Sequence, residues 1–343
     1  MDFKQIERKR RSETLSKYIQ SVPGFNSRND SSLRRLSTTV DRCASWLLYH
    51  EYYTENDVRL VAAETCKKHL LCPFCASRRG SRSIAKNMPK IMDYIAESPK
   101  LIPVLITLTV KNGPDLGERY RHLKTAFGKI RKRRSDSLRL DSRRGLASSE
   151  FGKIDGAVYS FEQTYNPDTG WHPHVHIMAF LTDYLDMVAL SQEWHDLTGD
   201  SFIVDARRIY PNSAGHGALG IEGALSEVYK YAVKLSDMTN ELTWHAYTVL
   251  RGKRLTGALG ALYGRVVESD ELMDEEIDDT PYVWRFYRWS RGRSTYDIAS
   301  TGTRGDMNPV DSVGCRASLD GADNSERRPL EIIDPASGLI LPY

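Results

Sequence analysis

The chain has 343 residues, of which 40% are hydrophobic and 27% charged, and its 48 basic and 45 acidic residues leave a formal net charge of +3. This composition is ordinary for a globular protein, and the length suits one large domain or two modest ones. The longest uncharged apolar run, Leu101 to Val110, is too short to cross a bilayer, and the basic N-terminus lacks the apolar segment of a signal peptide. We therefore expect a cytoplasmic protein with no membrane-spanning segment.

The first predicted elements are an N-terminal helical region, residues 1–60, and a small zinc-binding module, residues 61–85. The module contains the stretch CKKHLLCPFC. In a reducing cytosol this spacing favours a metal over disulfides, and no βαβ pattern supports a redox-active CxxC. We predict a structural Zn²⁺ with tetrahedral coordination. Its expected ligands are Cys66, His69, Cys72 and Cys75. Cys43 is the alternative to His69 as the fourth ligand.

A buried strand is predicted at IPVLITLTVK, which ends at the turn NGP, and an amphipathic helix follows from Leu116. Residues 119–144 hold 11 basic residues against two acidic ones, a local charge of +9. Such a patch favours a polyanionic partner, although a plain solvated helix face is the alternative. The candidate DNA contacts are Arg131, Lys132, Arg133 and Arg134.

The next two strands are predicted to form a hairpin around the turn NPDTG. In the second strand, HPHVHIMAFL, side chains alternate between the two faces, so three histidines share one face and the apolar face opposite them is the core. If the turn centres on Asp168, paired residue numbers sum to about 336, which places Glu162 opposite His174 and on its face.

Two imidazoles and one carboxylate would then converge on one point. Such a set leaves coordination positions open, which a catalytic metal ion requires and a structural one does not. Three surface histidines beside a strand glutamate are the alternative. The predicted metal ligands are His174, His176 and Glu162.

A helix, a strand and a further helix, IEGALSEVYKYAVKLS, follow in order. At about 100° per residue, Ile221, Ala224 and Val228 lie on an apolar stripe of this last helix, whereas Glu227, Tyr231 and Lys234 share a flank. A carboxylate, a phenol and an ammonium group there suit covalent catalysis. On this helix alone, an ordinary amphipathic surface is the stronger interpretation, and the nearby histidine strand shifts the balance.

The order of strands and helices with a tight hairpin predicts an α+β domain built on an antiparallel sheet. We expect this domain at residues 86–240 and its C-terminal extension, or a DNA-binding part, at 241–290. There YVWRFYRW is interpreted as a core strand in preference to a surface that stacks on bases. Residues 291–343, rich in Gly, Ser, Asp and Arg, are predicted to be a flexible tail.

Three segments resemble, in their order along the chain, the three motifs of rolling-circle plasmid replication initiators of the HUH endonuclease superfamily. These segments are the strand LITLTVK, then HPHVH, then EVYKYAVK. The CPFC with its trailing ASRRG is similar to the cysteine-containing region of a single-tyrosine branch of these initiators. The resemblance runs from about Cys66 to Lys234. It implies a central RRM-like antiparallel sheet flanked by helices, with the metal and the tyrosine helix on one face.

By this resemblance, His174, His176 and Glu162 would bind Mg²⁺ or Mn²⁺, Tyr231 would be the nucleophile, and Glu227 and Lys234 would assist it. The reaction implied is nicking and joining of single-stranded DNA at the double-strand origin, through a 5′-phosphotyrosine and a free 3′-hydroxyl. A host helicase and DNA polymerase would be partners, and a homodimer stays open.

Three other functions remain as alternatives. A transposase or a conjugative relaxase would use the same site, and the neighbouring DNA would distinguish it. A non-catalytic zinc-dependent DNA-binding regulator would bind DNA without any covalent adduct. A metallohydrolase of small substrates would leave the basic stretch and the cysteines unexplained.

Overall fold

The computed structural model describes residues 3–25, 31–139, 149–210, 219–229, 238–266 and 269–310. By its internal packing the chain divides into two compact units. Unit 1 comprises Met1–Cys66 and Met273–Tyr343, and unit 2 comprises Lys67–Leu272. None of the helices in these ranges combines the length and the apolar character that crossing a bilayer requires.

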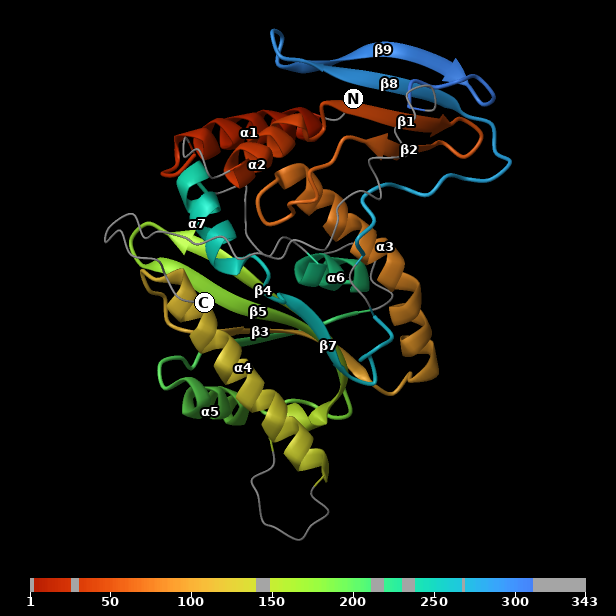
Figure 1. Cartoon of the computed structure of the whole chain (residues 1–343). Coiled ribbons are helices and arrows are strands. Elements are labelled where there is room, and N and C mark those ends of the chain that lie inside the picture. Colours follow the sequence, from red (N-terminus) through yellow and green to blue (C-terminus); the bar gives the residue numbers. More distant parts are fainter. Residues whose placement is uncertain are drawn as a thin grey trace. The chain divides into compact units, whose positions relative to one another are not determined.

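Unit 1 is a four-stranded antiparallel sheet with two helices that pack on each other (Figure 1). The strand order is β2-β1-β8-β9. The elements are α1 (Phe3–Ser21), α2 (Ser31–Arg42), β1 (Trp46–Tyr52), β2 (Asp57–Ala63), β8 (Val283–Ser290) and β9 (Thr295–Thr303). Strands from the N-terminal and C-terminal parts of the chain therefore pair in one sheet, where Leu48, Trp284 and Phe286 form a small buried core.

The boundaries of unit 1 differ from the predicted division of the chain. The aromatic run forms strand β8, as predicted, but β8 pairs with β1 near the N-terminus. Part of the predicted tail forms β9, and residues 1–60 hold β1 and the start of β2 as well as helices. The polar sequence of β9 has no strand signal of its own. The strand forms because it pairs with β8 along its whole length. Residues 311–343 of the predicted tail lie outside the described residues.

Unit 2 is built on a five-stranded sheet in which every pair of neighbours is antiparallel, with the order β6-β3-β5-β4-β7. The α+β class predicted from the sequence is confirmed. The strands are β3 (Ile102–Thr109), β4 (Ile154–Asn166), β5 (Gly170–Leu181), β6 (Val204–Arg208) and β7 (Thr256–Gly260). The helices are α3 (Pro73–Glu97), α4 (Leu116–Arg139), the 3-10 turn η1 (Glu150–Lys153), α5 (Met187–Thr198), α6 (Ile221–Tyr229) and α7 (Asn240–Leu250).

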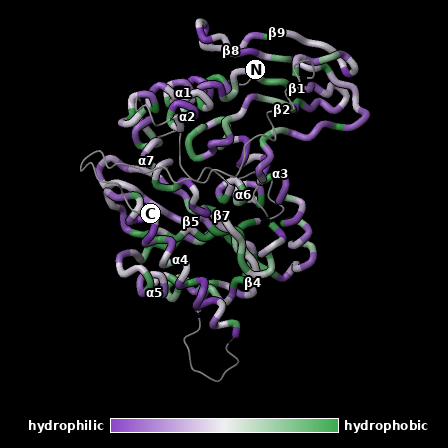
Figure 2. The backbone as a smooth tube through the Cα atoms, in the orientation of Figure 1, coloured by the Kyte–Doolittle hydropathy of each residue, from purple (hydrophilic) through white to green (hydrophobic). Residues whose placement is uncertain are grey.

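Helices cover both faces of this sheet (Figure 1). On one face, α3 and α6 pack against Leu105, Val158 and Met178. On the other face, the ring of Phe127 in α4 packs against Phe161 in β4, with centroids 5.5 Å apart. The hairpin strands are buried over much of their length, although they hold hydrophilic as well as hydrophobic residues (Figure 2). The prediction placed the core on one face only, but burial of apolar side chains on both faces is what a sheet between two helical layers requires.

Candidate metal centre

The β4–β5 hairpin has the register predicted from the sequence. Glu162 pairs with His174, and Asn166 pairs with Gly170 at the turn. The Asn166 side chain closes the turn by accepting hydrogen bonds from the backbone N–H groups of Asp168 and Thr169. Gly170 has a φ of +86°, and a Cβ there would lie 2.5 Å from the carbonyl oxygen of Gly113. A glycine is therefore required at the position that sets the register.

Glu162, His174 and His176 form a compact group on one face of the sheet. The Nε2 atoms of His174 and His176 lie 3.2 Å and 3.0 Å from the same Oε2 atom of Glu162. All three side chains are buried, and one donor atom from each lies within 4.8 Å of the others. The predicted convergence of two imidazoles and one carboxylate is therefore present in the structure.

The electrostatics of the group keep its carboxyl ionised. Burial by itself would raise the pKa of Glu162, but hydrogen bonds with the two histidines outweigh it and lower the pKa to about 2. Burial, and then the neighbouring His174, lower the pKa of His172. At neutral pH the centre therefore offers an anionic oxygen, and His172 beside it favours the neutral form.

The outer nitrogens of the histidines are held by polar neighbours. Thr107 Oγ1 lies 3.1 Å from Nδ1 of His176. The Nδ1 atom of His174 lies 3.3 Å from the carbonyl oxygen of His172. With Nδ1 held in this way, Nε2 of each ring is the atom turned toward Glu162. Such outer partners fix ring orientation and tautomer at metal centres.

His172 takes a different role from the other two histidines. Its Nδ1 lies 2.5 Å from Oδ1 of Asn112, and it is absent from the group that could hold an ion. The sequence pointed to the three histidines, but it did not single out Thr107 or Asn112. For Thr107 a signal was available in the predicted strand before the hairpin. That strand is β3, which pairs with β5 and places Thr107 opposite His176.

The donor set fits a divalent cation that also binds a substrate. Two imidazoles and one carboxylate supply three ligands, and the remaining coordination positions stay open. The carboxylate oxygen, with water or phosphate oxygens in the open positions, suits Mg²⁺ or Mn²⁺. The two imidazole nitrogens share the Oε2 atom of Glu162, which is ionised at neutral pH, so a cation bound there would meet a negatively charged ligand.

The predicted tyrosine helix packs on the same face as the metal centre. Ile221, Ala224 and Val228 of α6 are buried, as predicted, against Val158 and Met178. These two strand residues share a face with the metal ligands, because side chains alternate along each strand. Glu227 is half-buried, and Tyr229 is partly buried against the same core. Tyr231 and Lys234 lie outside the described residues.

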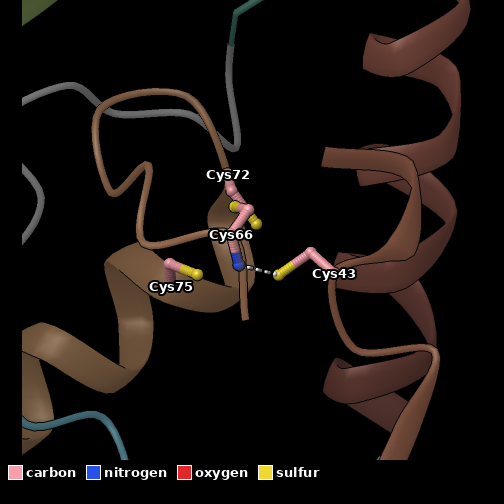
Figure 3. Close-up of side chains that lie close together, drawn as sticks. All are labelled: Cys43, Cys66, Cys72 and Cys75. Carbon is pink, nitrogen blue, oxygen red and sulfur yellow. Dashed lines mark hydrogen bonds between the residues drawn. The ribbon is translucent and has the colours of Figure 1, made fainter. Parts of the chain in front are cut away.

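A second group of potential ligands consists of four buried cysteines (Figure 3). Cys72 precedes α3 and Cys75 lies in its first turn, whereas Cys43 follows α2 and Cys66 follows β2. One Sγ atom from each lies within 4.8 Å of the others, and the Cys66 N–H donates to Cys43 Sγ over 3.4 Å. Four thiolates at this separation match the ligand set of a structural zinc.

Cys43, and not His69, completes this set. His69 Nδ1 lies 3.0 Å from Nη1 of Arg79 instead. The prediction chose His69 because it lies inside the CKKHLLCPFC stretch. In the structure the β1–β2 hairpin, which separates Cys43 from Cys66 in the sequence, folds back so that Cys43 lies beside the other three thiols. This folding back of the hairpin selects Cys43, and the spacing of residues within the CKKHLLCPFC stretch does not reveal it.

The four predicted DNA contacts of α4 differ in their surroundings. Arg131 Nη1 donates to Tyr159 Oη over 3.1 Å, and Arg134 donates to the carbonyl oxygens of Ile154 and Asp155 over 2.7–3.0 Å. Arg133 forms an ion pair with Glu193, with an N–O distance of 3.6 Å. Lys132 is exposed. The prediction treated the four as equivalent, whereas Arg131 and Arg134 tie α4 to the sheet.

Comparison with known proteins supplies a family. The model of a family described as "Replication protein" (Rep_1) matches residues 57–284. The chain is also 26% identical over 241 residues to "Protein rep" of Streptococcus pneumoniae serotype 2 (strain D39 / NCTC 7466), and this similarity covers 67% of the chain and 70% of that relative. No solved structure matches the chain.

Proposed function

The chain belongs to the replication protein family Rep_1, and we propose that it initiates rolling-circle plasmid replication by nicking one strand of the origin DNA. The observation that carries this proposal is the buried group of Glu162, His174 and His176, in which one carboxylate oxygen lies 3.2 Å and 3.0 Å from two imidazole nitrogens. A replication protein that only bound DNA would have no need for such a group. Unit 2, which holds it, would be the endonuclease part of the chain.

These three residues would hold Mg²⁺ or Mn²⁺, which when bound polarises a phosphate of single-stranded DNA and offsets the charge that develops in the transition state. The chain's own contribution is orientation. The Thr107 hydroxyl and the His172 carbonyl oxygen hold the outer nitrogens of the two histidines. Burial of all three ligands limits the water that could compete with the phosphate.

Tyr231 would be the nucleophile. Its phenol oxygen forms a bond to the scissile phosphorus, and the bond from phosphorus to the 3′ oxygen breaks. The products are a 5′-phosphotyrosine and a 3′-hydroxyl, which takes its proton from solvent and primes synthesis by a host polymerase. Glu227 would accept the phenol proton, and the Lys234 ammonium would balance the negative charge.

Termination would use the same residues. After one round, Glu227 would activate a water molecule, or a second attack by a DNA hydroxyl would release the strand, so that a second tyrosine is not needed. A host helicase would separate the strands ahead of the polymerase. The four cysteines would hold a Zn²⁺ with a structural role, because four thiolates leave no open position on a tetrahedral ion.

The proposal is tested by incubating the protein and Mn²⁺ with single-stranded oligonucleotides that tile its own replicon, and reading the products by denaturing gel and intact mass. We expect a covalent adduct that is lost in Tyr231→Phe and kept in Tyr229→Phe. The Tyr229 variant is the matched control, because it removes the same hydroxyl group two residues away, from a side chain that packs against the core. Binding without an adduct for any oligonucleotide or metal would overturn nicking and leave the DNA-binding regulator.

A further inference from the structure

Two lysine side chains of unit 2 lie around the ring of one buried tyrosine. The Nζ atoms of Lys124 and Lys253 lie 5.7 Å and 5.3 Å from the centroid of the Tyr120 ring. Lys124 comes from α4, and Lys253 comes from the loop between α7 and β7. Arg121, next to Tyr120 in α4, acts electrostatically on Lys253. We call Arg121, Lys124 and Lys253 the cationic rim.

The cationic rim has no acidic partner among the described residues. No ion pair joins any of its members to a carboxylate within those ranges, although Arg119, in the same helix, pairs with both Glu118 and Asp200. Burial, and then the charges of Arg121 and Lys124, lower the pKa of Lys253. Cations held together in this way repel one another unless an anion lies between them.

The scaffold under the cationic rim is rigid. The Tyr120 ring packs on Phe161 of β4 with centroids 5.7 Å apart, and its hydroxyl donates to the carbonyl oxygen of Arg254 over 3.4 Å. The Phe161 N–H donates to the carbonyl oxygen of Leu255 over 2.7 Å, which fixes the end of the loop that carries Lys253. Burial raises the pKa of Tyr120 to about 12, so the ring stays neutral and offers its electron-rich face to the two ammonium groups.

The cationic rim is distinct from the metal centre but joined to it by one strand. Phe161, which supports the cationic rim, precedes Glu162, and their side chains point to opposite faces of the sheet. The loop that carries Lys253 continues into β7, which is the edge strand beside β4. A strand of DNA that passes around this edge could contact both sites.

We infer that the cationic rim binds a phosphodiester group of the DNA backbone, at a site separate from the metal centre. Two ammonium groups and a guanidinium from two elements match an oxyanion with several acceptor oxygens. The buried Tyr120 ring leaves no face for stacking on a base, so the site would read backbone and not sequence. The inference rests on the proposed function for the identity of its ligand, because a free phosphate offers the same chemistry.

The test compares Lys124→Gln/Lys253→Gln with Lys90→Gln/Lys100→Gln in the full chain. The second pair removes the same charge from lysines of unit 2 that form no ion pair with described residues. Binding of labelled oligo(dT) is measured by fluorescence anisotropy over a series of salt concentrations. Each phosphate contact contributes about 0.7 to the slope of log K against log salt for single strands, so loss of this one contact in the first pair should reduce the slope by about 0.7. The control pair should leave the slope unchanged.

An unchanged slope in the Lys124/Lys253 variant, with a melting temperature equal to that of the unaltered protein, would overturn the site. A second titration uses inorganic phosphate alone. Tight, saturable binding of phosphate that the double variant loses would overturn the assignment to the DNA backbone. The Tyr231 adduct, assayed with the same preparations, separates the two proposals. If the unaltered protein forms an adduct and the slope is unchanged, only the cationic rim fails; a reduced slope without any adduct means that only nicking fails.

Discussion

Replacing Thr107 by valine tests whether the outer hydrogen bond on His176 prepares the metal centre. The change removes one hydroxyl and keeps both the branched shape and the strand preference. In the structure this hydroxyl lies 3.1 Å from Nδ1 of His176, whose Nε2 atom turns toward Glu162. Loss of such a partner lowers metal affinity by about 10- to 100-fold, or about 1.4–2.8 kcal/mol. We expect this rise in the dissociation constant of Mn²⁺, measured by calorimetry on metal-free protein.

Thr109→Val is the matched control for this change. Thr109 lies on the same strand and the same face, opposite His174, and its hydroxyl is buried without a hydrogen bond among the described residues. Its removal should leave Mn²⁺ affinity unchanged. Equal losses in the two variants would refute the reasoning, because the cause would then be general packing of β3. Unchanged affinity in Thr107→Val would refute it as well.

Three other changes test separate parts of the structure. Because the pKa of Glu162 falls from an ordinary 4.5 to about 2, its charge stabilises the metal-free fold above about pH 4.5, and this stabilisation is lost as the pH falls toward 2. Glu162→Gln should therefore lower the free energy of unfolding by about 3 kcal/mol at neutral pH and by about half as much near pH 3, as measured with urea. Cys43→Ser should lose bound zinc in elemental analysis, and His69→Ala should keep it; the reverse result would restore the histidine as ligand. Arg134→Gln should destabilise the protein by about 1.5–3 kcal/mol through its lost carbonyl contacts, whereas Lys132→Gln should leave stability within about 0.5 kcal/mol. Equal unfolding midpoints for these last two variants would contradict the assigned role of Arg134.

The β4–β5 hairpin was predictable because all of its information is local. The turn NPDTG and the alternation of HPHVHIMAFL were enough to pair Glu162 with His174, and the structure has that pairing. The apolar stripe of α6 was predictable for the same reason, since helical geometry assigns Ile221, Ala224 and Val228 to one side. Side-chain alternation in a strand and the helical repeat need no knowledge of distant residues.

The sequence by itself thus determined the α+β class, the hairpin register and the convergence of Glu162, His174 and His176. Tertiary structure alone decided which residues from distant segments join them. It placed Thr107 against His176, brought Cys43 to the other cysteines, turned Arg134 onto the sheet and gathered Lys124 and Lys253 around Tyr120. It also paired β8 with β1. The physical reason is that these contacts depend on how separate elements pack, and the spacing of residues along one segment carries no record of its distant partners.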